Sequence, residues 1–290
     1  MAQFQTSVAP PPYLGNAGPM GAAPPPPPYF DQGARFQEFC ARYEIGAEYA
    51  SKLRLLSDVE IVVVADDSGS MSTMTQIDDD PFGPMQSRWD ELKKSLLLIV
   101  DIALLFDQNG IDIYFLNRTA MDQHGRLIRL VLRNVTQPAA IEAAFAAPPG
   151  GFTPLARTVK SVFDEKQAIV KEKRLLCLIC TDGEPTNDSG VVDIDGFRTV
   201  LATRQPIDRI FVNIMACSDD DGAIGYLSKL DSSIKNLDVI DDYRSERKEV
   251  LRKAPGAPYS FGDHIVKTLV GSLDPSMDKL DEKSSCCVLL

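Results

Sequence analysis

Oxygen-bearing side chains follow two predicted strands of the chain, and another lies within a glycine-rich loop. These residues are Asp66, Ser68, Ser70, Thr153 and Asp182. The first three follow the apolar run 61–65, the last follows the run 175–180, and the threonine lies in a Gly-Gly loop that opens a helix. Ligands of parallel sheets bind beyond the carboxyl ends of the strands, so we expect the five side chains to lie together.

Two carboxylates and three hydroxyls form a donor set for a hard divalent cation. The carboxylates balance the charge of the ion, while the hydroxyls ligate it without adding negative charge. Such oxygen ligands favour Mg²⁺ or Mn²⁺. Five side chains leave one position of a six-fold shell open, and we expect an Asp or Glu of a protein ligand to fill it.

The pattern Asp66-x-Ser68-x-Ser70, with Thr153 and Asp182 further on, resembles the metal-ion-dependent adhesion site of von Willebrand factor A domains. The resemblance covers roughly residues 58–240. It implies that the three hydroxyls ligate the metal, and that the two carboxylates bind it directly or through water. Tyr43-Glu44-Ile45 and the segment 239–243 resemble the intracellular members of microbial eukaryotes, which implies a binding module of unassigned partner.

Each of these residues also has an ordinary structural interpretation. Ser68 and Ser70 are of a type favoured at helix N-caps and turns, and Asp182-Gly183 is a common turn dipeptide. Only the combination of all three segments favours a metal site.

Alternating strand and helix patterns predict an α/β fold, doubly wound, with a mostly parallel sheet and helices on both faces. Strands are expected at 61–65, 111–116, 175–180, 210–216 and 237–240. Residues 127–147 have an ambiguous pattern, for which we expect a strand at 127–132 and then a helix through 144. We expect a Pro-rich tail at 1–33, a helical extension at 34–57, the main domain with its C-terminal helices at 58–273 and a flexible tail at 274–290.

Residues 1–30 contain nine of the twenty prolines and no charged residue, which predicts a disordered or polyproline II tail. Two Pro-Pro-x-Tyr motifs lie within it. They resemble ligands of WW domains, which grip polyproline II segments, and they imply WW-domain partners such as ubiquitin ligases. The residues concerned are Pro10, Pro11 and Tyr13 in one motif and Pro26, Pro27 and Tyr29 in the other. A solvated proline linker is the alternative interpretation.

The chain ends in Cys287-Val288-Leu289-Leu290, which fits a C-a-a-X box for geranylgeranylation of Cys287. One prenyl chain anchors a protein only reversibly, so a second signal is expected. Residues 274–283 carry four acids and two lysines and provide no basic run. The neighbouring Cys286 is therefore the predicted second lipidation site, and a membrane is a predicted partner.

The formal charge of −11 over 290 residues argues against nucleic acid as a partner. The chain shows no secretory signal or membrane-spanning run, and six cysteines are too few for a disulfide scaffold. We therefore expect a cytoplasmic protein on the cytosolic face of a membrane. Cys177-x-x-Cys180 lies within an apolar strand, which places the two thiols on opposite faces and favours buried structural cysteines.

These expectations combine into a metal-dependent protein-interaction module, tethered by prenylation and recruiting WW-domain proteins. The sequence offers no catalytic triad, since His124 and His264 have no nucleophile motif beside them. We therefore predict that the chain is not an enzyme. Two alternatives stay open, a metal-dependent hydrolase that uses the same acids and an adaptor whose main domain is only a scaffold.

Overall fold

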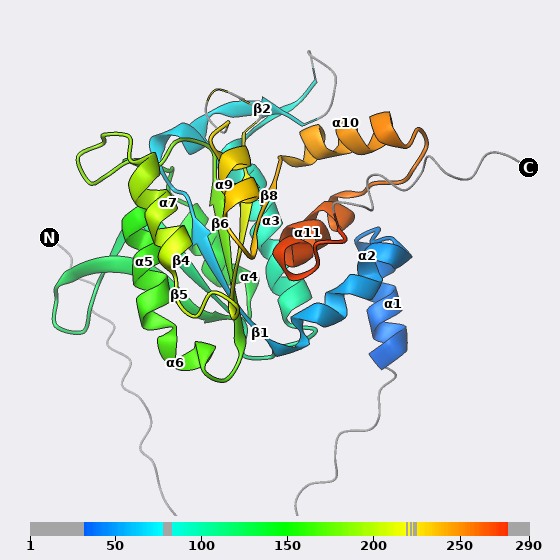
Figure 1. The fold of residues 1–290 in the computed structure, drawn as a ribbon, viewed down its shortest axis with the longest axis horizontal. Coiled ribbons are helices and arrows are strands. Elements are labelled where there is room, and N and C mark those ends of the chain that lie inside the picture. The colour runs from blue at the N-terminus through cyan, green and yellow to red at the C-terminus, as the bar shows by residue number, and fades with distance from the viewer. Residues whose placement is uncertain (1–31, 78–82, 219, 221, 223–224, 278–290) are drawn as a thin grey trace, which may run out of the picture.

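The computed structural model describes residues 32–77, 83–218, 220, 222 and 225–277. Its centre is a six-stranded sheet (Figure 1). In spatial order the strands are β5 (Leu127–Val135), β4 (Ile111–Met121), β1 (Val59–Ala65), β6 (Arg174–Thr181), β7 (Ile210–Ala216) and β8 (Leu237–Ile240). β5 pairs antiparallel with β4, and the other neighbours pair in parallel. The predicted α/β class with a mostly parallel sheet is confirmed.

The inner strands are buried on both faces, which explains their unbroken apolar sequences. Alternate side chains of β1 enter different cores: Val63 packs with one cluster, and Val62 and Val64 pack with the other. Cys177 and Cys180 divide in the same way and are fully buried and free, as predicted. Burial raises the pKa of the Cys177 thiol to about 12, so this thiol is held in its inert neutral form.

Helices cover both faces of the sheet. One face carries α3 (Arg88–Ala103), α4 (Pro138–Phe145) and α11 (Phe261–Val270), with α1 (Gln32–Arg42) and α2 (Ala47–Lys52) against the same core. The other face carries α5 (Leu155–Glu165), α6 (Gln167–Val170), α7 (Ile194–Thr203) and α9 (Leu227–Ser233). α10 (Tyr243–Lys253) packs on α11. The described residues also form three short 3₁₀ turns: η1 (Leu53–Asp58), η2 (Gly69–Ser72) and η3 (Gly271–Leu273).

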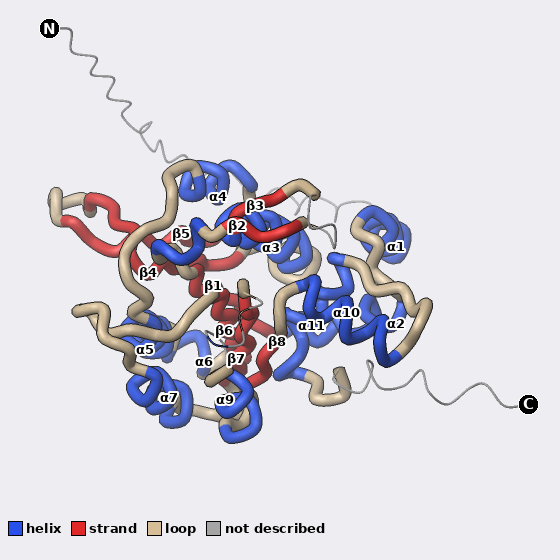
Figure 2. The backbone as a smooth tube through the Cα atoms, turned by 90° about the horizontal axis from the view of Figure 1, so that it is seen from above, coloured by secondary structure: helices blue, strands red, loops and turns tan. Residues whose placement is uncertain are grey.

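The segment that sequence patterns left ambiguous forms β5 and α4. The view from above shows β4 and β5 extending beyond the helices as a hairpin (Figure 2). A second, two-stranded sheet of β2 (Met74–Gln76) and β3 (Met85–Ser87) was not predicted. It precedes α3, which begins at Arg88 because the Ser87 hydroxyl accepts the Asp90 N–H as an N-cap.

Side chains join α2 and its N-cap residue to α11 and to the residue that follows η3. Asp263 accepts one hydrogen bond from Gly46 N at 2.7 Å and another from Ser260 N at 3.0 Å, the latter as part of a capping box at the start of α11. Lys52 Nζ lies 2.6 Å from Asp274 Oδ2. Gly262 is required here, because a Cβ at this position would lie 2.1 Å from Tyr43 O. The N-terminal helices and α11 are therefore fixed to one another.

None of the helices within the described ranges combines the length and apolar character needed to cross a bilayer.

Candidate functional site

Two adjacent strands bring the two predicted carboxylates to the same edge of the sheet. β1 and β6 pair in parallel with Ala65 opposite Cys180, so Asp66 and Asp182 both follow at the carboxyl ends. Asp66 N donates to Cys180 O at 2.9 Å, which continues the ladder by one bond. In the sheet, β1 has β4 as one neighbour and β6 as the other, so the strand order reverses at β1. Asp66 and Asp182 therefore lie at the position where parallel sheets bind ligands.

The hydroxyls of η2 connect with these carboxylates. Ser68 Oγ and Ser70 Oγ are 3.0 Å apart, and Ser70 Oγ donates to Asp182 Oδ1 at 2.7 Å. Ser68 N donates to Asp66 Oδ1 at 2.8 Å. Four of the five predicted residues therefore form one connected polar group.

The ordinary capping interpretation fails for Ser68. It is the N-cap residue of η2, but its side chain makes no capping hydrogen bond. Its hydroxyl is instead directed to Ser70, which in turn reaches the carboxylate of a different strand.

Thr153 lies in a loop that is tied to the same edge. Gly150 N donates to Asp67 O at 2.8 Å, and Gly69 N donates to Gly151 O at 3.2 Å. Gly151 has a φ of 101°, and a Cβ there would lie 2.6 Å from Asn117 Oδ1, so this position requires glycine. Among the described contacts none joins the Thr153 hydroxyl to the other four residues, although the backbone bonds bring its loop against them.

The two carboxylates have unequal charge partners. Asp182 is 1% exposed, and its Oδ2 lies 2.9 Å from Nη1 of Arg88, whose Nη2 donates to Ser218 Oγ at 2.8 Å. Asp66 is fully buried, accepts a hydrogen bond from Thr181 Oγ1 at 2.6 Å, and forms no ion pair with any described residue. Burial and the nearby Asp182 raise the pKa of Asp66 to about 7.

Asp67 has a structural role beside this group. Its carboxylate accepts the backbone N–H groups of Leu116, Asn117 and Arg118 at 2.8 to 2.9 Å. These bonds fix the stretch of β4 in which its register with β5 shifts. Burial is the largest influence on the pKa of Asp67 and raises it, while these bonds and Arg118 oppose the effect.

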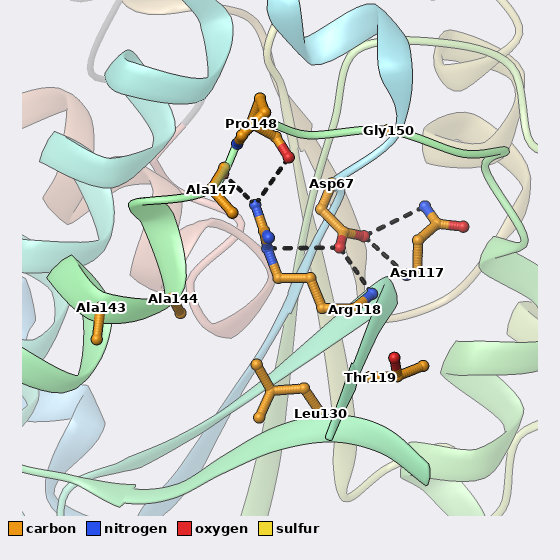
Figure 3. Close-up of a pocket in the computed structure, with 10 residues that line it drawn as sticks. All are labelled: Asp67, Asn117, Arg118, Thr119, Leu130, Ala143, Ala144, Ala147, Pro148 and Gly150. Carbon is orange, nitrogen blue, oxygen red and sulfur yellow. Dashed lines mark hydrogen bonds and ion pairs between the residues drawn. The ribbon is translucent and has the colours of Figure 1, made fainter. Parts of the chain in front are cut away.

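A cavity of about 400 Å³ opens on the other side of Asp67 (Figure 3). Figure 3 shows the Arg118 guanidinium reaching across it toward Ala147 and Pro148, with Leu130 and Thr119 at the opposite end and α4 along one side. The lining residues are Asp67, Asn117, Arg118, Thr119, Leu130, Ala143, Ala144, Ala147, Pro148 and Gly150.

The sequence analysis missed Arg88, Arg118 and this cavity. Arg88 reaches Asp182 across 94 positions of the chain, and Arg118 lies 51 positions from Asp67. Neither arginine belongs to a recognisable motif, so only the fold reveals their neighbours.

The residues present fit an oxygen-bound divalent cation. Asp66 is a buried carboxylate without a cationic partner in the described part of the chain, and hydroxyls and a second carboxylate lie beside it. A search of the described residues finds no group of three or more His, Cys, Asp or Glu side chains suited to a metal. The candidate site therefore relies on two carboxylates with hydroxyl ligands.

The remaining predicted sites lie outside the described residues. They are the WW-type motifs with Pro10, Pro11, Tyr13, Pro26, Pro27 and Tyr29, and the lipidation cysteines Cys286 and Cys287. These motif assignments stay predictions.

Comparisons with known proteins find structures but no sequence family. No family model and no curated protein matches the chain. Among solved structures, a mutant of the PilB minor pilin from Streptococcus sanguinis matches with 12% identity and a TM-score of 0.46, over 78% of this chain and 62% of that one. The pilus adhesin SpaC from Lactobacillus rhamnosus GG matches with 15% identity and a TM-score of 0.42, over 73% of this chain and 30% of that one. This chain thus aligns with less than two thirds of either structure.

These findings correct several predictions. The structures found are bacterial pilus components, whereas the sequence resemblance implied an intracellular von Willebrand factor A protein. The assignment to that family, with the adhesion site as a family feature, is therefore wrong. The comparisons do not test whether the five residues bind a cation. The same findings overturn the intracellular interaction function with its prenyl tether and WW-domain recruitment, and its hydrolase and scaffold alternatives. They also overturn the expected location on the cytosolic face of a membrane. The two pilus structures assign no ligand, residue role or location to this chain.

Proposed function

We propose that the carboxyl edge of the sheet binds a divalent cation, Mg²⁺ or Mn²⁺, and that a carboxylate of a protein ligand completes the coordination of this ion. Asp66, Ser68, Ser70, Thr153 and Asp182 are the proposed protein ligands. The bound ion would supply a concentrated positive charge that attracts an anionic oxygen. The proposed role is binding, and it includes no reaction.

This proposal rests on an excess of negative over positive charge at the strand ends. Two carboxylates, Asp66 and Asp182, are almost completely removed from water, and one guanidinium, that of Arg88, faces them. A buried charge without a partner is costly for a folded protein. A divalent cation beside Asp66 would offset that cost, which is a physical reason for such a pair to exist.

Arg88 leaves part of the group accessible to an ion. Its guanidinium contacts Oδ2 of Asp182, whereas Ser70 contacts Oδ1 of the same carboxylate. Ser68 and Ser70 would help to hold the ion, which would replace the hydrogen bond between their hydroxyls. Arg88 would then keep the Asp182 side chain in position.

Thermal unfolding during a Mg²⁺ titration tests the cation site. At a concentration about one hundred times the Kd, binding adds about 2.7 kcal/mol, which for a domain of this size raises Tm by about 5 to 10 °C. Asp66→Asn and Ser70→Ala should abolish the shift. Asp164→Asn is the matched control, because Asp164 is 64% exposed and pairs with Lys160 on the surface of α5.

Equal shifts for the wild type and Asp66→Asn would contradict the proposed site. The protein ligand is tested separately, by capturing proteins from an extract in Mg²⁺ and eluting them with EDTA. Converting the carboxyl groups of the extract to amides beforehand should prevent capture. Capture that survives both this treatment and EDTA would contradict a carboxylate bridge.

A further inference from the structure

Arg118 is held in one orientation at the mouth of the cavity between the β4–β5 hairpin and α4. Its guanidinium carbon lies 4.8 Å from the centre of the Trp89 ring, and Nη2 donates to Ala147 O at 2.6 Å. The side chain is 14% exposed. An arginine fixed in this way has already lost the conformational freedom that ligand binding would otherwise cost.

This guanidinium has an unused donor. Arg118 Nε is buried and has no hydrogen-bond acceptor in the described part of the protein. The nearest carboxylate oxygen, Asp67 Oδ2, is 3.7 Å away and already accepts the backbone N–H of Arg118. A buried N–H without an acceptor costs about 1 to 3 kcal/mol, so the structure lacks an oxygen at this point.

The cavity is small and has both polar and apolar surface. Leu130 on β5 and the alanines of α4, Ala143 and Ala144, form its sides, opposite the polar end at Arg118 (Figure 3). The volume of about 400 Å³ falls within the range of small-molecule sites, about 300 to 1,000 Å³. One polar end and apolar sides are typical of sites for a short amphipathic molecule.

We infer that this cavity binds a small anion with a short apolar body, whose acidic head contacts Arg118 and whose body lies against Leu130 and α4. Asp67 Oδ2 forms an ion pair with Arg118 Nε at 3.7 Å, but the Asp67 oxygens accept the backbone N–H groups of β4 and the Nε hydrogen still has no acceptor among the described residues. The head group is a carboxylate or a phosphate, since arginine binds both. The inference is independent of the proposed cation site.

The chain contains one tryptophan, Trp89, and it lies directly under the guanidinium. Its fluorescence therefore reports on the proposed site. The full-length protein is titrated with hexanoate, hexyl phosphate and hexanol in EDTA, where no divalent ion can hold a carboxylate. We expect a saturable change in Trp89 emission with at least one of the two anions, and at least about tenfold weaker binding of hexanol.

Variants separate this site from general anion binding, with affinities measured by calorimetry. Arg118→Gln should weaken binding of the anion by at least about tenfold. Ala144→Leu keeps the charge but fills the cavity from α4, and should abolish binding. Arg126→Gln is the control, because Arg126 lies on the same hairpin and its side chain is 74% exposed.

The titrations and the variants together decide whether the cavity binds an anion. Binding of only one anion identifies the head group. Absence of binding by both anions, or equal binding of hexanol and the anions, would overturn the inference. Unchanged affinity in Arg118→Gln or in a folded Ala144→Leu protein, checked by its thermal unfolding, would overturn it as well.

Discussion

The buried carboxylate of Asp66 predicts an unusual dependence of stability on pH in the absence of divalent ions. The pKa of this group is raised from 3.8 to about 7 by burial and by Asp182. The folded protein therefore holds a proton between these two pH values that the unfolded chain has released. The free energy of unfolding must fall as the pH rises through this window, the reverse of an ordinary ion-paired Asp.

The magnitude follows from the same two values. Each pH unit between them is worth about 1.36 kcal/mol, so the cost approaches about 4 kcal/mol above pH 7. Asp66→Asn removes this cost and keeps an oxygen to accept the Ser68 N–H. It disturbs the bond from Thr181 Oγ1, at a cost of about 1 kcal/mol. In EDTA at pH 8, the variant should be more stable than the wild type by about 2 to 3 kcal/mol.

Urea unfolding in EDTA at pH 5 and pH 8 measures this difference. At pH 5 most of the advantage of Asp66→Asn should disappear, because the wild-type carboxyl group is protonated in the folded state. Asp164→Asn, at an exposed position, provides the baseline for a charge change on the surface. A variant that is less stable than the wild type at both pH values would refute the conclusion that Asp66 lacks a charge partner.

Three further substitutions test other parts of the structure. Arg88→Gln removes the cation that faces Asp182, so it should lower stability in EDTA by about 3 to 5 kcal/mol. It also removes a positive charge that repels the ion, and should therefore tighten Mg²⁺ binding in a calorimetric titration; weaker binding would mean that the positioning of Asp182 by Arg88 outweighs this repulsion. Gly151→Ala places a methyl group against Asn117 at a φ of 101°, and urea unfolding should show a loss of about 1 to 3 kcal/mol together with a lower Mg²⁺ affinity. Arg204→Met should cost about 3 to 5 kcal/mol in the same assay, because four backbone carbonyls lose their buried guanidinium donor; a smaller loss than in Arg126→Gln would contradict this role.

The parts of the fold that could be predicted are those in which burial controls the residue type. The strand predicted at 210–216 coincides with β7, and that at 237–240 coincides with β8, because strands buried on both faces leave unbroken apolar runs. The small sheet of β2 and β3 was not predicted. Its strands are three residues each, Met-Thr-Gln and Met-Gln-Ser, which is too short for a periodic pattern.

The same contrast applies to the candidate site. Its acids and hydroxyls follow recognisable strands, so their proximity could be predicted for four of the five residues. The charges that act on them could not, because Arg88 comes from the start of a helix after a sheet that was not predicted. The family assignment failed for a different reason: a short pattern of common residue types does not by itself identify ancestry.

The side-chain bonds that join α2 to α11 and Asp274 have a mechanical consequence. Because Gly46 and Lys52 are bonded to Asp263 and Asp274, the two ends of the described chain meet on one side of the molecule. A force that separates these ends would load those two bonds and the α2–α11 contact before it reached the central sheet. We therefore expect the contact between α2 and α11 to break before the strands of the central sheet separate.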